Sequence, residues 1–258
     1  MIMRCYQLNR YALRLVAIFA LLVSTLLTTA ATGPTASGTV TPTPTNTVVV
    51  STATPVYVQG SFAGPQSPQS TVAVSYPGAQ TGGDLNVVAV GWNDTTASVT
   101  SVVDSAGNSY QVAVPMGQTT GLRQTIYYAK NVAASAGNTV TVTFSQAAAY
   151  PDIRILEYAN VDRTNPFDVG ASASGSATTA TSGTATTAAA PELLVGAGMT
   201  TGIFNGAGSG YTSRMITSPD GDIAEDQVVM AAGSYAATAS VSGTWLMQLA
   251  SFRASGFK

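Results

Sequence analysis

Histidine is absent from this chain of 258 residues, and cysteine occurs once, at Cys5. Without histidine the chain has no Ser-His-Asp triad, no histidine-ligated zinc or haem and no imidazole general base. Cys5 precedes an apolar run that we interpret as part of a leader, so the mature chain has no disulfide, thiol nucleophile or thiolate metal ligand. Any chemistry must come from carboxylates, hydroxyls, tyrosine, lysine or arginine.

Charged residues are also scarce, at 9% of the chain against 45% hydrophobic residues. Such a composition can bury a core and is not typical of a disordered chain. Three of the ten basic residues, Arg4, Arg10 and Arg14, lie in the leader, which leaves seven basic against twelve acidic residues and a mature net charge of −5. We expect no nucleic-acid partner, because neutralising phosphates requires a basic surface.

Residues 1–31 have the pattern of a secretory signal peptide. The three arginines form a basic region, Leu15 to Leu27 is an apolar run, and Thr29-Ala30-Ala31 offers small residues for cleavage. The apolar run is shorter than the roughly 20 residues of a spanning helix. We therefore expect a protein that is secreted or at the cell surface, with no membrane span after cleavage; an uncleaved anchor is the alternative.

Residues 32–55 are rich in threonine and proline and include T-P-T-P-T at Thr41 to Thr45. Prolines without an amide donor favour an extended, solvated segment, so this part is predicted to be a linker. The folded domain is predicted over residues 56–258.

The domain is predicted to be all-β, because no helical period of useful length follows residue 30 while short alternating strands recur. Leu85 to Trp92 is apolar at nearly every position, which indicates a strand covered on both faces. Two S-A-G-N loops, Ser105 to Asn108 and Ser135 to Asn138, are expected to close hairpins. Residues 170–190, composed largely of small residues, are expected to form edge strands.

Tyr150 to Asp162 is predicted to contain a central strand, and Thr244 to Arg253 resembles it. The two stretches align at an offset of 94, and Leu85 to Ala89 aligns with Leu193 to Ala197 at an offset of 108. A duplicated unit would produce this similarity, and so would chance among alternating strands. We predict two antiparallel sheets packed face to face in a jelly-roll-like β-sandwich.

The alternation also suggests a ligand site. Leu85, Val87 and Ala89 should face the core, while the other face of this strand ends at Trp92. On the matching strand the other face carries Gly196 and Gly198, which leave room for a ligand, unless another layer covers them. We predict that Trp92 stacks on a sugar and that Asn93 and Asp94 supply polar contacts.

The densest acidic group is S-P-D-G-D-I-A-E-D, with Asp220, Asp222, Glu225 and Asp226. Clustered carboxylates could hold a structural calcium ion, which takes six to eight oxygen ligands. Pro-Asp-Gly is also a turn signature, and the spacing departs from that of an EF-hand loop, so the turn is the favoured interpretation. No other cofactor is expected.

Arg154 and Glu157 should lie on opposite faces of the central strand, each paired elsewhere. Glu157 with Asp94 or Asp162 could provide the two carboxylates of a glycosidase, although a structural ion pair is the simpler explanation. Eight aromatic residues could include a stacking platform for sugar rings, although most should be in the core: Trp92, Tyr110, Tyr127, Tyr128, Tyr150, Tyr158, Tyr211 and Trp245.

Four stretches carry a resemblance to a known group: G-D-L-N-V-V-A-V-G-W-N-D, D-S-A-G-N-S-Y, Y-P-D-I-R-I-L-E-Y and S-P-D-G-D-I-A-E-D. With them, residues 56 to 253 resemble the secreted β-sandwich modules of unknown function in bacterial extracellular proteins, which often follow Thr/Pro linkers. The resemblance implies a bacterial envelope or extracellular setting and, by analogy of fold, a binding or adhesive role. It brings no catalytic motif.

Three functions remain open. The first is a non-catalytic module that binds glycan or another cell-surface component. The second is a structural surface protein that self-associates through its edge strands. The third is a carboxylate-dependent enzyme that cleaves glycans.

Overall fold

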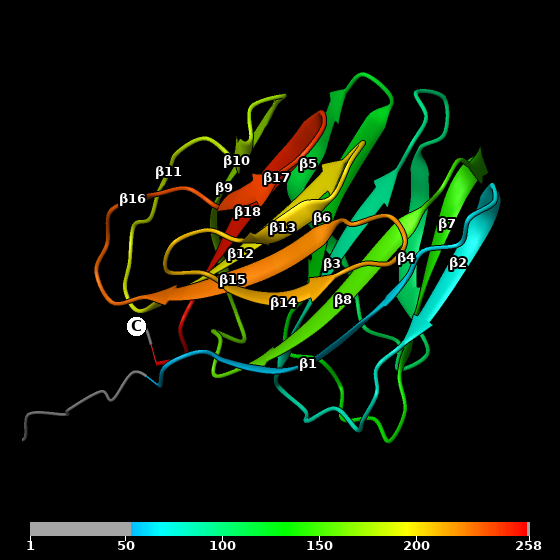
Figure 1. Ribbon diagram of the computed structural model, residues 1–258. Helices are drawn as coiled ribbons and strands as arrows, with labels where there is room; N and C mark the ends of the chain where they lie inside the picture. The colour runs from blue at the N-terminus through cyan, green and yellow to red at the C-terminus, as the bar shows by residue number, and fades with distance from the viewer. Residues whose placement is uncertain (1–52, 257–258) are drawn as a thin grey trace, which may run out of the picture. The chain divides into compact units, whose positions relative to one another are not determined.

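The computed structural model describes residues 53–256, which form β-strands and connecting turns with no helix (Figure 1). The predicted all-β class is confirmed, and the first strand begins at Val56, where the domain was expected to begin. The predicted leader and residues 32–52 of the linker lie outside the described residues. None of the described residues belongs to a helix that could cross a bilayer. In chain order the strands are β1 Val56–Ala63, β2 Gln69–Ser75, β3 Leu85–Trp92, β4 Val99–Asp104, β5 Gln111–Thr119, β6 Leu122–Ala129, β7 Thr139–Ala148, β8 Asp152–Ala159, β9 Phe167–Gly175, β10 Thr179–Thr181, β11 Ala185–Thr186, β12 Glu192–Thr200, β13 Phe204–Ala207, β14 Thr212–Ile216, β15 Ile223–Val229, β16 Ser234–Tyr235, β17 Thr238–Val241 and β18 Trp245–Arg253.

The strands form two large and two small antiparallel sheets, with β11 and β16 as a separate pair. The first large sheet has the order β1-β8-β3-β6-β5, and the first small sheet has the order β2-β7-β4. The second large sheet has the order β14-β15-β12-β18-β9, and the second small sheet has the order β10-β17-β13. The sandwich therefore contains more layers than the two sheets predicted.

Three hydrophobic cores separate these layers. The first small sheet packs on the first large sheet, the two large sheets pack on each other, and the second small sheet packs on the second large sheet. Leu85, Val87 and Ala89 share the central core with Leu193 and Val195, so the predicted core face is confirmed. Both large sheets are thus covered on both faces, which explains why Leu85 to Trp92 is apolar throughout.

The predicted central strand is β8, which lies between β1 and β3. Its counterpart β18 lies between β12 and β9. Ile155 faces the outer core and Leu156 the central core, so neighbouring residues alternate between two buried environments. Arg154 therefore points toward the second large sheet and Glu157 away from it, as predicted.

The two halves of the chain have the same strand order. The eight strands of the first half, β1 to β8, correspond in order to eight strands of the second half. Corresponding strands have corresponding neighbours in the two large sheets and in the two small sheets. The strands of the second half are β9, β10, β12, β13, β14, β15, β17 and β18. The register also agrees: Val88 pairs with Ile155, and the offsets of 108 and 94 carry this pair onto Gly196 and Leu249, which pair as well. A duplicated unit would produce this agreement.

The two S-A-G-N loops do not close hairpins, and that prediction was wrong. The first joins β4 in the small sheet to β5 in the large sheet, and the second joins β6 to β7 in the same two sheets. The loops bind each other instead, because the Asn138 amide donates to Asp104 at 2.9 Å and accepts from the hydroxyl of Ser105 at 3.1 Å. The hairpin in this region joins β5 to β6 through Thr120 and Gly121, where Gly121 has a φ of 73°.

The glycine-bearing face of β12 is covered, not open to a ligand. An added Cβ on Gly198 would lie 2.5 Å from Phe204 Cζ and 2.8 Å from Met247 Sδ. Gly196 is similarly crowded by Ala237 and Glu225. The small residues therefore allow the second small sheet to approach closely, as a covering layer requires.

This packing predicts that Gly198→Ala destabilises the protein by about 1–3 kcal/mol, because the added methyl group overfills a close-packed core. Gly206→Ala is the matched control, since a Cβ there meets nothing within 4 Å and the backbone is not in the left-handed region. Urea unfolding monitored by tryptophan fluorescence measures both changes. Equal midpoints for the two variants would contradict the close approach.

Candidate functional site

Trp92 is a core residue, and its predicted place at an exposed rim was wrong. Its side chain is 1% exposed, and its ring lies 5.5 Å from that of Phe144 in an edge-to-face contact. It belongs to the core between the first small and first large sheets. The prediction treated the second face of β3 as open, whereas β2, β7 and β4 cover it, so Trp92 offers no free face to a sugar.

Asp94 shapes a loop. Its Oδ1 accepts hydrogen bonds from the backbone N–H groups of Thr96 and Ala97, each at 2.7 Å, and its Oδ2 accepts one from Ala149 N at 2.9 Å. Burial opposes ionisation, but these hydrogen bonds outweigh it and lower the pKa of Asp94 below its usual value. Asn93 is exposed and is the one member of the predicted trio that lines a cavity.

The four acidic residues predicted as a calcium site do not form one. Glu225 and Asp226 are neighbours on β15 and point to opposite faces: Glu225 Oε2 accepts from Gly208 N at 3.2 Å, while Asp226 receives two hydrogen bonds from Arg214. In residues 53–256 no group of three acidic, histidine or cysteine side chains is placed to hold a metal ion. The turn interpretation is correct, because residues 218–220 form a turn and Gly221 has a φ of 72°.

Asp220 and Asp222 instead line a pocket of about 290 Å³ at one end of the large sheets. Both halves of the chain build it, through the loops that follow β1, β3 and β7 and those that follow β12 and β14. Asn93 and Thr201 are equivalent residues of the two halves at the offset of 108. The pocket therefore lies where corresponding loops of the two halves meet, a region that we call the seam. The lining residues are Gln66, Asn93, Tyr150, Thr200, Thr201, Gly202, Pro219, Asp220 and Asp222.

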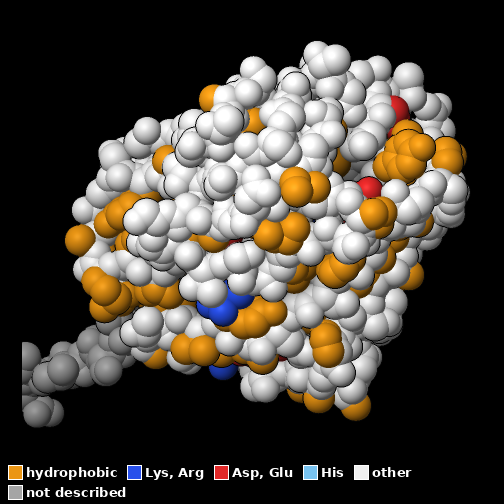
Figure 2. Space-filling view, in the orientation of Figure 1, with side chains coloured by type: hydrophobic (Ala, Val, Ile, Leu, Met, Phe, Trp, Pro, Cys, Tyr) orange, Lys and Arg blue, Asp and Glu red, His pale blue; other side chains and the backbone are white. Residues whose placement is uncertain are grey.

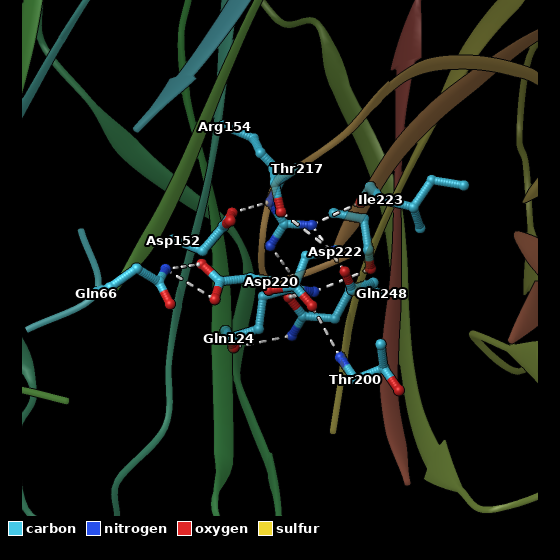
Figure 3. Close-up of polar contacts among 12 residues, drawn as sticks. Gln66, Gln124, Asp152, Arg154, Thr200, Thr217, Asp220, Asp222, Ile223 and Gln248 are labelled. Carbon is cyan, nitrogen blue, oxygen red and sulfur yellow. Dashed lines mark hydrogen bonds and ion pairs between the residues drawn. The ribbon is translucent and has the colours of Figure 1, made fainter. Parts of the chain in front are cut away.

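Behind the pocket lies a buried polar cluster around Arg154 (Figure 3). Arg154 Nη1 donates to the backbone oxygens of Gly198 at 2.8 Å and Ile223 at 2.5 Å, both in the second large sheet. Its Nη2 donates to Gln124 at 2.7 Å, and its Nε lies 2.8 Å from Asp152 Oδ1. A single guanidinium thus ties the end of the first large sheet to the second.

The carboxyl groups beside Arg154 have raised pKa values. Burial, and then the charge of Asp152, raise the pKa of Asp222 well above its usual value. Burial also raises the pKa of Asp152, against the attraction of Arg154. Asp222 Oδ1 accepts a hydrogen bond from Thr200 N at 2.9 Å, which links this buried carboxyl to the pocket wall.

Tyr150 is the exposed aromatic residue of the pocket, with 47% of its surface accessible. Its φ of 42° is in the left-handed region, which is rare for a bulky side chain and marks a strained position. The sequence included Tyr150 among eight candidate aromatics but could not single it out. Its φ and the covering of Trp92 both depend on the tertiary structure.

Glu157 is not paired with Asp94 or Asp162 in the way a glycosidase would require. It is buried, accepts a hydrogen bond from Gln59 at 2.5 Å, and lies opposite Asn86 in the sheet, six residues before the end of β3 at Trp92, whereas Asp94 lies in the loop beyond that end. At about 3.3 Å per residue the strand from Asn86 to Trp92 spans roughly 20 Å, far beyond the reach of one glycosidic bond. Asp162 accepts hydrogen bonds from Thr164 N and Asn165 N in its own turn.

Comparison with protein-family models, curated proteins and solved structures gives no match for this chain.

The buried Glu225 predicts a pH-dependent stability. Burial, opposed by the hydrogen bond from Gly208, raises its pKa from 4.5 to about 8. The folded state therefore holds this proton more tightly than the unfolded state, so its contribution to stability is complete below about pH 4.5 and is lost as the pH rises through 8. Glu225→Gln cannot ionise and should match the wild type near pH 5 but be more stable near pH 9, by on the order of a few kcal/mol.

The check is thermal unfolding of both proteins between pH 5 and pH 9. Burial raises the pKa of Asp84 to about 6 and that of Glu192 to about 7. As the pH rises, these two groups should lower the stability of both proteins alike. The difference between the two proteins therefore isolates Glu225. A difference that stays constant with pH would show that Glu225 does not hold its proton in the fold.

Proposed function

We propose that this protein is a non-catalytic extracellular or cell-surface module that binds a glycan in the pocket at the seam between its halves. The observation that carries the proposal is an exposed tyrosine beside hydrogen-bonding side chains in one pocket. Sugar rings present an apolar face and a rim of hydroxyl groups, which an aromatic ring and nearby amides, hydroxyls and carboxylates can match. Tyr150, Gln66, Asn93, Thr201 and Asp220 provide these groups.

The location of the pocket supports the same proposal. Binding sites often form between domains and are carried on loops positioned by a rigid scaffold. Here five loops from the two halves of the sandwich meet above buried sheets. A strained residue such as Tyr150 persists only where the surrounding structure holds it in place, and such residues cluster at ligand sites.

The surface and the leader sequence support an extracellular setting. Figure 2 shows a face with few charged side chains and no stripe of lysine and arginine. Together with the mature net charge of −5, this does not favour a nucleic-acid partner. The signal-peptide pattern and the threonine- and proline-rich segment before the domain favour secretion and display away from a surface.

Tyr150→Asn should weaken glycan binding about tenfold or more, because ring stacking contributes on the order of 1 kcal/mol or above. Asparagine tolerates the left-handed backbone, so the substitution removes the ring without adding strain. Tyr150→Phe is the matched control and should keep most of the affinity. A glycan array of residues 32–258, followed by titration of the best ligand, measures the effect; equal affinity for all three proteins would exclude Tyr150 as the stacking residue.

Self-association is the second candidate, and one feature favours it. β9 is an edge of the second large sheet, with nine residues whose outer backbone groups have no strand partner among residues 53–256. A long edge of small residues can accept a strand from another chain. Light scattering over a range of protein concentrations distinguishes the two: growth of the mean mass with concentration favours self-association, and a constant monomer mass leaves glycan binding as the function.

A further inference from the structure

The pocket that we propose for a glycan has negative charge and no cation facing the ligand. Its lining includes two carboxylates, Asp220 and Asp222, and no lysine or arginine. Arg154 lies behind the pocket, its Nη1 and Nη2 donate to Gln124 and to backbone oxygens of the second large sheet, and its Nε lies 2.8 Å from Asp152 Oδ1. The guanidinium is therefore not free to bind an anionic sugar.

Asp220 has unused capacity for a ligand at the mouth of the pocket. Its two oxygens each accept a hydrogen bond from Gln66 Nε2 at 2.9 Å. A carboxylate has about four lone-pair sites, so at least two remain available. Figure 3 shows Asp220 with Gln66 on one side and the Arg154 cluster on the other.

Asp152 is a second carboxyl group close to Asp220, and its hydrogen bonding is incomplete. It is fully buried, its Oδ1 lies 2.8 Å from Arg154 Nε, and among residues 53–256 neither of its oxygens accepts a hydrogen bond of good geometry. A Cβ built on Gly64 would lie 2.8 Å from Asp220 Oδ2 and 3.5 Å from Asp152 Oδ2, so both oxygens lie close to the backbone of this glycine. Buried carboxylate oxygens are normally paired, so a positive group bound at Asp220 would also lie close to an incompletely paired carboxyl group.

We propose that the pocket selects a sugar that carries an ammonium group, such as a 2-amino sugar, and that Asp220 is the residue that sets this preference. The inference rests on the proposed function, since it names the class of glycan bound at the same site. The ammonium donates to the free lone pairs of Asp220, and Tyr150 offers a ring face that also favours a cation. A metal ion fits less well, because no three acidic groups of residues 53–256 are placed to ligate one.

The test compares ligands of one length with different charges. Isothermal titration of the full mature chain at about pH 6, where a sugar amine is protonated, uses glucosamine oligomers, N-acetylglucosamine oligomers and galacturonate oligomers. Spermidine serves as an ammonium source without a sugar, and Ca²⁺ as a metal. We expect the glucosamine oligomer to bind at least tenfold more tightly than its N-acetylated counterpart, with a difference that shrinks as salt is added.

Asp220→Asn should remove this preference and leave binding of the N-acetylated oligomer unchanged. Asp162→Asn is the matched control, because it makes the same change of charge in a turn outside the pocket and should keep the preference.

Three results would overturn the inference without overturning glycan binding. They are equal binding of the two oligomers by the wild type, a preference for galacturonate, and tighter binding of Ca²⁺ than of the glucosamine oligomer. Binding of spermidine alone would support ammonium recognition but exclude a sugar, and binding of none of the probes would overturn both proposals.

Discussion

The arrangement of the two halves depends on one buried guanidinium. Arg154 extends from β8 of the first large sheet and reaches the backbone oxygens of Gly198 and Ile223 in the second. A charge that is fully removed from water is tolerated only when its donors are satisfied and an opposite charge lies close. Gln124 and these two oxygens accept from Nη1 and Nη2, and Asp152 Oδ1 lies 2.8 Å from Nε, so the guanidinium links the facing strands of the two sheets.

The same interaction determines the pocket. Asp152 and Arg154 begin β8, and Thr200 and Asp222 lie at the equivalent end of the second large sheet, so the cluster forms the floor on which loops from both halves rest. Gln124 and Gln248 extend the polar contacts along the interface, with Gln124 Nε2 donating to Ala197 O at 2.9 Å. Stability and the proposed ligand site therefore rest on the same residues.

Periodicity in the sequence predicted most of the fold. The uninterrupted apolar run Leu85 to Trp92 indicated a strand buried on both faces, and the offsets of 108 and 94 placed corresponding strands in the same register.

The site was harder to predict. Alternation assigns Trp92 to a face but does not say which layer covers that face, and the S-A-G-N pattern indicates a tight loop without saying whether it stays in one sheet. Asp220 and Tyr150 are 70 residues apart in the chain, and only the packing of the halves brings them into one pocket.

The most direct test of this account is a double-mutant cycle on Arg154 and Asp152, measured by urea unfolding. Arg154→Met should destabilise the protein by about 3–5 kcal/mol, because it leaves a buried carboxylate and two backbone oxygens without their partner. Adding Asp152→Asn should restore part of that loss, giving a coupling of about 1–3 kcal/mol between the two sites. A loss below about 1 kcal/mol for Arg154→Met, with no coupling to Asp152, would show that the halves are held by apolar packing alone and would contradict the account.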